Sequence, residues 1–454
     1  MLSKNIKIQM PKWVKYIINT LEEFDYEAYI VGGCIRDSLL ERKVNDWDIA
    51  TNGKPQDVIE IFESLGYQII PTGLKHGTVT VVINNENYEI TTYRIDGEYD
   101  DNRHPKEVTF TNSLEEDLSR RDFTINAMAY NDKEGLVDYF GGLRDLEYKE
   151  LNCVGNAEER FKEDKLRILR AIRFASVYDL EIHRNIIYAI EEDNDLSKLS
   201  KERIRSEFNK IMLSEKPSIW LNLMLRLGLL EQIVPEIIKC FVFDQLNPHH
   251  NRNVFDHILE VVDNTESILE LRLSALFHDI GKPKCFSLDE NGIGHFYSHQ
   301  KESAKICENR MRELKYSSKE IENVRELVYW HMNICDNTSL KSIKKFIKNI
   351  SVDRLEYLFK LKVADISASV YCYEDYADVF KTKYECEKIL NEKQPLTVKD
   401  LDIDGYDLMK LGIKQGKEMG IILNKLLDII LENPNLNNKE DLIKIVRSKV
   451  INEC

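Results

Sequence analysis

The stretch Tyr29–Thr51, YIVGGCIRDSLLERKVNDWDIAT, sets a pair of glycines and an Arg-Asp just ahead of two aspartates that are one residue apart. In an extended strand, residues two positions apart point to the same side. We therefore expect Asp46 and Asp48 to present two carboxylates to one point. Mg²⁺ binds in proteins through one or two carboxylates together with substrate phosphates. The pattern predicts a magnesium site that also receives a phosphorylated substrate.

The glycine pair predicts where the phosphates bind. Gly32 and Gly33 end an apolar run, and residues without a side chain allow the backbone to approach a triphosphate closely. Arg36 would add a positive charge beside it. The simpler alternative is a surface turn with solvated aspartates, which is the usual meaning of an isolated Asp-x-Asp. The order GG-x-x-RD followed by D-x-D is far rarer by chance and favours a nucleotide site.

Length and composition describe an ordinary soluble protein with more than one core. The 454 residues suggest about three domains. Hydrophobic residues make up 43% and charged residues 31%, and no apolar run is long enough to span a bilayer. The start has no signal-peptide pattern, and the nine cysteines form no CxxC or regular framework. These features predict a cytoplasmic protein with reduced thiols that does not bind membranes.

The charge distribution limits the possible partners. A net charge of −15 argues against a general polyanion binder. Basic residues nevertheless gather between Arg160 and Arg173, so one patch can meet a nucleotide or nucleic acid.

Hydrophobic patterns divide the chain into a mixed front part and a helical rear part. The runs AYIVGG, DWDIAT, TVTVVI and YEITTYR indicate strands mixed with helices, and after Asn156 the strand signal fades. We expect an α+β head with a mixed sheet, followed by mostly helical segments. The predicted segments are a head at 1–155, a helical neck at 156–240, a further helical domain at 241–390 and a helical tail at 391–454.

Five motifs carry a resemblance to a known family. The stretch Val31–Thr51 resembles the nucleotide-binding motif of the class II nucleotidyltransferases, the bacterial-type CCA-adding enzymes and poly(A) polymerases of the polymerase β superfamily. The other four follow in the family's order and cover the front half: RRDFTINAMAYN (Arg120–Asn131), VDYFGGLRDL (Val137–Leu146), EDKLR (Glu163–Arg167) and ERIRSEFNKIM (Glu202–Met212).

The resemblance assigns roles in the head. Asp46 and Asp48 would be catalytic and hold Mg²⁺ ions that activate the RNA 3′-hydroxyl for attack on the α-phosphorus. Arg121 and Asp122 would face the sugar and phosphates of the nucleotide. Glu89 is either a third carboxylate of the site or the partner of an arginine.

Charged residues recur every third position between Glu163 and Phe174, and we expect them to form a stripe along one helix. The resemblance implies that Asp164 and Arg167 read a base edge as a protein template that chooses CTP or ATP, since carboxylates accept and guanidiniums donate in fixed directions. A solvated helix face is the plain alternative. The predicted nucleotide-binding residues are Gly33, Arg36, Arg121, Asp122, Asp164, Arg167, Arg170 and Arg173.

A charged, glycine-containing stretch at 93–108 resembles the flexible loop of CCA-adding enzymes, which CC-adding relatives lack or shorten. It favours an enzyme that also adds the final A. The chain has no basic C-terminal extension of the kind typical of bacterial poly(A) polymerases.

Histidines and aspartates in the rear half follow the order of the HD metal-dependent phosphohydrolases: His257, then His278-Asp279, then Asp365. His299 and His331 lie where HD proteins with two metals often place further ligands. Imidazole and carboxylate together suit a divalent transition metal such as Ni²⁺, Mn²⁺ or Co²⁺, although lone histidines are usually structural. The resemblance implies phosphatase or cyclic phosphodiesterase activity.

These observations favour a CCA-adding tRNA nucleotidyltransferase that acts on the 3′ acceptor end of tRNA with CTP and ATP, with the tail contacting tRNA. One alternative is a poly(A) polymerase or an A-adding tRNA enzyme. An alternative of another class is an HD phosphohydrolase whose front half is a regulatory nucleotide-binding module. Intact Asp46 and Asp48 argue against the latter.

Overall fold

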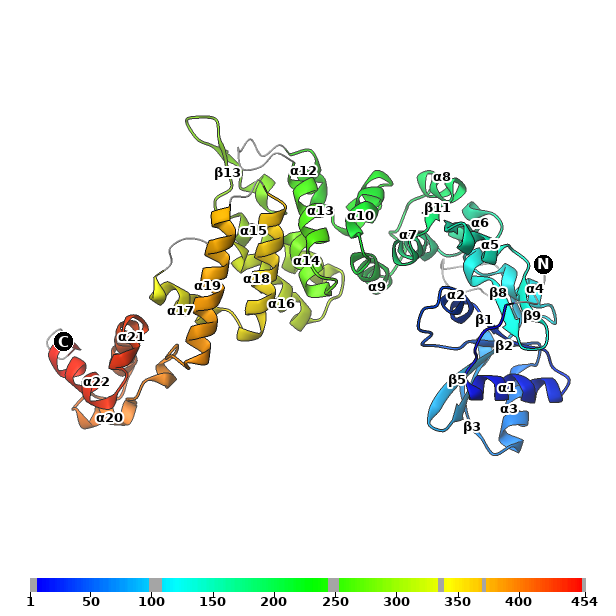
Figure 1. The fold of residues 1–454 in the computed structure, drawn as a ribbon, viewed down its shortest axis with the longest axis horizontal. Coiled ribbons are helices and arrows are strands. Elements are labelled where there is room, and N and C mark those ends of the chain that lie inside the picture. The colour runs from blue at the N-terminus through cyan, green and yellow to red at the C-terminus, as the bar shows by residue number, and fades with distance from the viewer. Residues whose placement is uncertain (1–5, 98–107, 244–252, 334–338, 370–372, 451–454) are drawn as a thin grey trace. The chain divides into compact units, whose positions relative to one another are not determined.

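The chain forms two compact units, Met1–Ile233 and Val234–Cys454 (Figure 1). The predicted boundary at residue 240 lies near their division, whereas the boundaries at 155 and 390 fall inside the units and stay predictions. The computed structural model describes residues 6–97, 108–243, 253–333, 339–369 and 373–450.

The first unit is built on a seven-stranded mixed sheet. β2 and β5 run parallel, and the other neighbouring strands are antiparallel. This confirms the expected mixed sheet. β1, β2 and β4 lie within the runs that predicted them, and β5 overlaps its run but begins two residues earlier. The spatial order is β3 (Gln68–Gly73), β4 (Thr78–Ile83), β5 (Glu86–Thr92), β2 (Ile49–Thr51), β1 (Ala28–Val31), β8 (Met128–Asn131) and β9 (Gly135–Asp138).

The central strands bring the glycine pair beside the aspartate pair. All four residues of β1 are buried, as its unbroken apolar sequence AYIV requires of a strand covered on both faces. β1 pairs with β2 so that Ile30 lies opposite Ile49, and the Val31 N–H donates to the Asp48 carbonyl oxygen at 3.0 Å. The turn after β1 and the segment before β2 therefore meet at one edge of the sheet.

Helices form most of the remainder of the first unit, and α7 packs against α9. The short strands β10 (Glu150–Leu151) and β11 (Glu181–Ile182) form a parallel pair. The short strands β6 (Arg94–Asp96) and β7 (Val108–Phe110) pair with each other. The loop predicted at 93–108 lies for its larger part, 98–107, outside the described residues. The helices are α1 (Lys12–Glu23), α2 (Gly33–Leu39), α3 (Pro55–Ser64), α4 (Leu114–Ser119), α5 (Gly142–Glu147), α6 (Ala157–Glu163), α7 (Leu166–Tyr178), α8 (Arg184–Glu192), α9 (Lys201–Met212), α10 (Pro217–Arg226) and α11 (Leu230–Ile233).

In the described residues of the second unit, the one strand pair is a hairpin of β12 (Ser287–Leu288) and β13 (Gly294–His295), and the other regular elements are helices. Its helices are α12 (Ile237–Phe241), α13 (Val254–Asn264), α14 (Leu269–Phe277), α15 (His299–Glu313), α16 (Ser318–Trp330), α17 (Leu340–Asn349), α18 (Val352–Ser367), α19 (Tyr373–Asn391), α20 (Gly405–Lys410), α21 (Lys417–Glu432) and α22 (Lys439–Ile445).

The apolar residues of the tail form a core of their own. Leu408, Leu426, Ile430 and Leu442 are fully buried in it, so the helical leucine and isoleucine spacing there serves packing. Within the described part of the chain, no helix is long and apolar enough to cross a membrane. Six cysteines of the described residues are free thiols: Cys34, Cys153, Cys240, Cys285, Cys307 and Cys386.

Candidate active sites

A pocket of about 540 Å³ lies in the first unit, a size typical of ligand sites. Residues from the turn after β1, from the segment 120–126, from α7 and from α9 line it. The excess of positive charge suits a triphosphate. Its charged lining residues are eight arginines, Arg36, Arg94, Arg120, Arg121, Arg167, Arg170, Arg173 and Arg203, and four aspartates, Asp48, Asp96, Asp122 and Asp164.

The glycines after β1 are closely approached by arginine side chains. Gly32 has φ +79°, and a Cβ there would lie 2.7 Å from Nη1 of Arg121. A Cβ on Gly33 would lie 3.4 Å from Nη2 of Arg36. Both glycines line the pocket. Their missing side chains therefore make room for two of the guanidinium groups that line the pocket.

Asp46 and Asp48 precede β2, which begins at Ile49, so they lie in an irregular segment and not in the strand we expected. Both are exposed, and Asp48 lines the pocket. The surrounding protein raises the pKa of Asp48, Arg121 opposes this effect, and the charge of Asp46 adds to it. A divalent cation would stabilise the charged form of Asp48 against this effect.

Glu89 lies on β5 with its side chain exposed. β2 and β5 pair so that Ile49 lies beside Ile90. The described residues that line the pocket include neither Asp46 nor Glu89. The roles of these two carboxylates stay predictions.

Arg36 is fixed at the wall of the pocket and is only 6% exposed. Its guanidinium donates to Asp37 at 2.9 Å and to the side chain of Asn126, and it lies 4.3 Å from the ring centre of Tyr178. A cation held by an acid, an amide and an aromatic face loses little further freedom when it meets a phosphate.

Asp122 is buried and bonded to the protein on both oxygens. It accepts from Arg170 Nε at 2.7 Å, from Asn126 Nδ2 at 3.1 Å and from the Phe123 N–H at 2.9 Å. Burial by itself would raise the pKa of Asp122, but Arg170, Asn126 and the Phe123 N–H hold it below its usual value. Asp122 therefore stays charged and positions Arg170 and Asn126 at the pocket.

The charged stripe that we expected on one helix is divided between Asp164, which ends α6, and Arg167, which lies on α7. α7 begins at Leu166, and Asp164 ends α6 with an extended backbone, φ −140° and ψ 106°. The helix is interrupted here because the Asp164 side chain caps the start of α7: its Oδ1 accepts a hydrogen bond from the Leu166 N–H at 2.9 Å. Asp164 still lines the pocket together with Arg167, Arg170 and Arg173.

Arg167 is held from several directions. It donates to the carbonyl oxygens of Arg160 and Arg120, both at 3.2 Å, and to Glu163. Glu163 belongs to the predicted motif, but it contacts Arg167 and is not itself at the pocket wall.

Sequence reasoning assigned no role to several residues at this pocket. Asn126 belongs to the motif RRDFTINAMAYN, and Phe174 directly follows Arg173. Arg203 belongs to the motif ERIRSEFNKIM, which was the one sequence feature that could have pointed to it. Arg94 and Asp96 flank the segment 98–107 and carried no signal.

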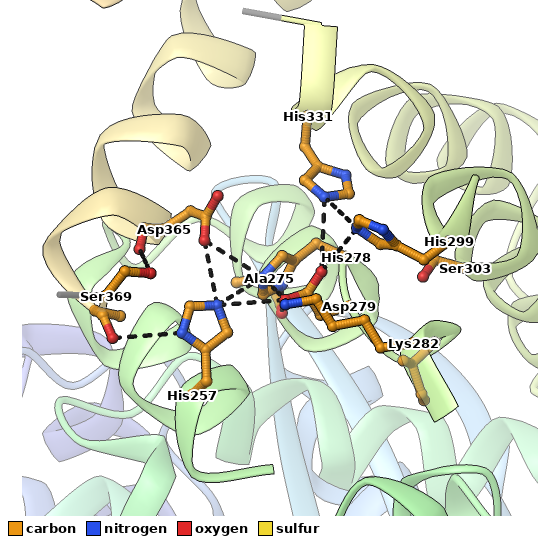
Figure 2. Close-up of polar contacts among 12 residues, drawn as sticks. His257, Ala275, His278, Asp279, Lys282, His299, Ser303, His331, Asp365 and Ser369 are labelled. Carbon is orange, nitrogen blue, oxygen red and sulfur yellow. Dashed lines mark hydrogen bonds and ion pairs between the residues drawn. The ribbon is translucent and has the colours of Figure 1, made fainter. Parts of the chain in front are cut away.

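The second candidate site brings together all six predicted residues of the rear half (Figure 2). His257 lies on α13, His278 and Asp279 follow α14, His299 begins α15, His331 follows α16 and Asp365 lies on α18. The four histidines and Asp279 are at most 5% exposed.

Asp279 is shared between two groups of histidines. Its Oδ2 lies 3.4 Å from His257 Nε2 and 3.3 Å from His278 Nε2. Its Oδ1 lies 3.1 Å from His299 Nε2 and 3.7 Å from His331 Nε2. Asp365 Oδ1 joins the first group, 3.2 Å from His257 Nε2.

Backbone carbonyls orient the histidine rings. The Nδ1 atoms of His278, His299 and His331 lie 2.7–2.8 Å from the carbonyl oxygens three residues earlier, and His257 Nδ1 lies 3.4 Å from that of Ala368. A carbonyl can only accept, so we assign the Nδ1 proton to each ring. Each Nε2 is then left to face the centre as a metal ligand.

The electrostatics of the cluster suit a cation. Burial by itself would raise the pKa of Asp279, but His278 and Lys282, which donates to Asp279 at 2.7 Å, hold it well below its usual value. Burial is the main cause that lowers the pKa of His331 to about 4, so this ring is neutral at pH 7. Mixed nitrogen and oxygen donors fit a divalent transition metal. Lys282 follows Asp279 by three residues, and the sequence alone predicted no role for it.

Three segments match known families. Residues 28–152 match the poly A polymerase head domain, 179–241 the probable RNA and SrmB-binding site of polymerase A, and 254–370 the HD domain.

Solved structures share the fold. A Bacillus stearothermophilus CCA-adding enzyme in complex with CTP has a TM-score of 0.70 at 25% identity, covering 98% of this chain and 100% of the other. A Thermotoga maritima CCA-adding enzyme complexed with tRNA has a TM-score of 0.62 at 21% identity, covering 97% of each chain.

Sequence relatives extend over the whole chain. A CCA-adding enzyme of Pediococcus pentosaceus is 46% identical over 210 residues, 46% of this chain and 52% of the relative. That of Lactobacillus johnsonii is 32% identical over 95% of both chains. That of Ligilactobacillus salivarius is 33% identical over 99% of this chain and 100% of the relative. With two relatives above 30% identity along nearly its full length, and both sites in place, the chain belongs to the CCA-adding enzyme family.

Proposed function

We propose that this chain adds the CCA sequence to the 3′ acceptor end of tRNA, using CTP and ATP without a nucleic-acid template. The observation that carries the proposal is the placement of Asp164 and Arg167 in one pocket with Asp48 and a set of arginines. That pocket combines base-reading groups, phosphate-binding groups and a metal-binding carboxylate.

The chemistry of the two bases explains the choice of residues. Cytosine and adenine carry an amino group where uracil and guanine carry a carbonyl oxygen. The Asp164 carboxylate can only accept hydrogen bonds, so it favours the amino bases. Arg167 can only donate, which suits the neighbouring ring nitrogen of either base.

The pocket residues divide the remaining work. Arg36, Arg121 and Arg170 would bind the triphosphate, and Asp122 keeps Arg170 in place. Asp46 and Asp48 would hold Mg²⁺, which would supply charge neutralisation at the reacting phosphate and activation of the 3′-hydroxyl. Arg121 favours the charged form of Asp48, although its surroundings as a whole raise its pKa.

Incubation with tRNA that ends at the discriminator base tests this function. With CTP alone we expect two cytidines to be added, and with CTP and ATP together the product should end in CCA. A poly(A) polymerase would instead add a long A tract from ATP alone. An A-adding enzyme would act only on tRNA that already ends in CC.

A second activity is supported by the cluster around Asp279. We propose that it holds a divalent transition metal, Ni²⁺, Mn²⁺ or Co²⁺, and hydrolyses phosphate esters such as 2′,3′-cyclic nucleotides. The shared position of Asp279 between two histidine groups supports two ions. Bound there, the metal would supply Lewis acidity toward the phosphate and toward water. Metal-stripped protein should regain hydrolysis when one of these ions is added, and failure with all of them would exclude the activity.

Further proposals concern the surroundings of the reaction. Residues 391–454 would contact tRNA, as would the neck at 156–240. The free cysteines and the lack of a spanning helix in the described part of the chain support action in the cytoplasm.

A further inference from the structure

Helix α9 carries the fifth motif, ERIRSEFNKIM, to which the reaction so far assigns no task. It packs against α7 and provides two charged residues toward the nucleotide pocket. Arg203 donates to Asp164 at 2.7 Å, and Glu207, one helical turn later, accepts from Arg173. α9 thus holds two charged groups of the pocket by ion pairs: Arg203 holds the Asp164 carboxylate, and Glu207 holds the Arg173 guanidinium.

The contact with Arg203 fixes the direction in which Asp164 can accept. The torsion that turns a carboxylate about its Cβ–Cγ bond is intrinsically broad. Here Oδ1 accepts from the Leu166 N–H at 2.9 Å and Oδ2 from Arg203 Nη2 at 2.7 Å, so both oxygens are set. A carboxylate has about four acceptor sites, which leaves capacity for a base amino group in one fixed direction.

The burial of this pair makes the contact effective. The side chains of Arg203 and Asp164 are 21% and 16% exposed, so water competes weakly for their charges. They are 39 positions apart in the sequence, which means that the packing of α9 decides their contact.

We propose that Arg203 is a positioning residue that determines base specificity: it orients Asp164 so that the carboxylate accepts the amino group of cytosine or adenine. This inference rests on the proposed base-reading role of Asp164. Without Arg203, the carboxylate would turn more freely and would distinguish amino from carbonyl bases less well.

Arg203 also lines the pocket, so a direct contact with a phosphate is the competing role. The two roles predict different kinetics. A phosphate contact is the same for every nucleotide, so its loss would lower kcat/KM equally for all four triphosphates. A positioning role changes the ratios between amino and carbonyl bases.

The test compares Arg203→Met with wild type, using CTP against UTP on tRNA ending at the discriminator base and ATP against GTP on tRNA ending in CC. We expect both kcat/KM ratios to fall about tenfold, the scale of discrimination by one well-placed base contact. Arg203→Lys keeps the charge without the reach of the guanidinium and should lose a few-fold. Lys210→Met removes an exposed cation from the same helix and should leave both ratios unchanged.

Equal losses for all four nucleotides in Arg203→Met would overturn the inference. If that variant does not fold, unchanged ratios in Arg203→Lys would overturn it equally. Failure of the underlying function looks different: wild type would then add no CCA, or Asp164→Ala would keep full discrimination.

Discussion

Asp48 has to remain ionised next to another carboxylate in order to hold a cation. Its surroundings and Asp46 raise its pKa, and Arg121 counteracts them. An amide at this position would have the size of the carboxylate but not its charge, so it would hold a cation poorly.

Asp48→Asn should lower nucleotide addition by at least about 10³-fold, since stabilisation by a metal ion contributes several kcal/mol to such transition states. The same result is expected for Asp46→Asn. Both residues are exposed, so the melting temperature should stay close to that of wild type. Single-turnover addition of CTP to tRNA is the measurement, and near-normal rates in either variant would contradict the role in metal binding.

The fit of Arg121 against Gly32 makes a second prediction at this scale. Gly32→Ala should displace Arg121, whose Nη1 would lie 2.7 Å from the new Cβ, and should raise KM for CTP and ATP alike. Gly66→Ala is the matched control, because Gly66 has a similar φ of +84° and nothing within 4 Å. Both variants place a side chain at positive φ, but Gly32 also has ψ −129°, outside the left-handed region, so Gly32→Ala should lose more stability than Gly66→Ala and KM is compared on folded protein. Equal KM values in the two variants would show that Arg121 does not depend on this space.

At the scale of elements, the third motif holds the second motif in place. The carboxylate of Asp138 accepts from the N–H groups of Gly142 and Leu143, at 2.9 and 3.0 Å, and so starts α5. A Cβ on Gly142 would lie 2.2 Å from the carbonyl oxygen of Thr124, within RRDFTINA. VDYFGGLRDL therefore shapes the nucleotide pocket without lining it.

The turn after α14 is packed just as closely on α15. A Cβ on Gly281 would lie 2.7 Å from the Ser303 N and 2.8 Å from the carbonyl oxygen of His299. The Gly281 N–H also donates to Ser303 Oγ at 2.9 Å. This contact sets the distance between Asp279 and His299.

Gly281→Ala should move α15 away and weaken the ligand group of Asp279, His299 and His331 more than the group that contains His257. Calorimetric titration of stripped protein with Mn²⁺ should then show fewer or weaker sites than in wild type. Gly420→Ala is the control, because a Cβ there meets nothing within 4 Å. Unchanged metal stoichiometry and affinity in Gly281→Ala would contradict the proposed role of α15.

At the scale of the whole molecule, two centres with different donor sets lie in different compact units. Carboxylates with arginines suit Mg²⁺ and a triphosphate, whereas imidazoles with carboxylates suit a transition metal. We therefore expect that the chain can lose one proposed centre and keep the other.

The double variant His278→Ala with Asp279→Ala should abolish hydrolysis of 2′,3′-cyclic nucleotides and leave CCA addition within about twofold of wild type. Both activities are measured on one preparation, with and without added Ni²⁺, Mn²⁺ or Co²⁺. Asp48→Asn is the reciprocal control and should retain hydrolysis. Hydrolysis that survives in the double variant would place that activity elsewhere.

Local pattern determined much of this protein. The runs AYIVGG, DWDIAT, TVTVVI and YEITTYR identified four strands of the sheet, because buried and half-buried strands favour apolar and β-branched residues. The order of His257, His278-Asp279 and Asp365 predicted a second metal site, and the structure brings these residues together with His299 and His331. Residue type and order along the chain are enough to predict such a site, because metal binding requires particular donor groups.

Only the tertiary structure decided which distant residues meet. The three-residue repeat after Glu163 suggested one helix, but Asp164 ends α6, because its side chain accepts from the Leu166 N–H and from Arg203 of α9. In the same way, the packing of α15 and α16 against the turn after α14 makes Asp279 the residue shared by two histidine groups. Periodicity in the sequence shows which face of a helix is buried. Which neighbouring helix covers that face depends on the packing of the whole unit, and the contacts of Asp164 and Asp279 depend on that packing.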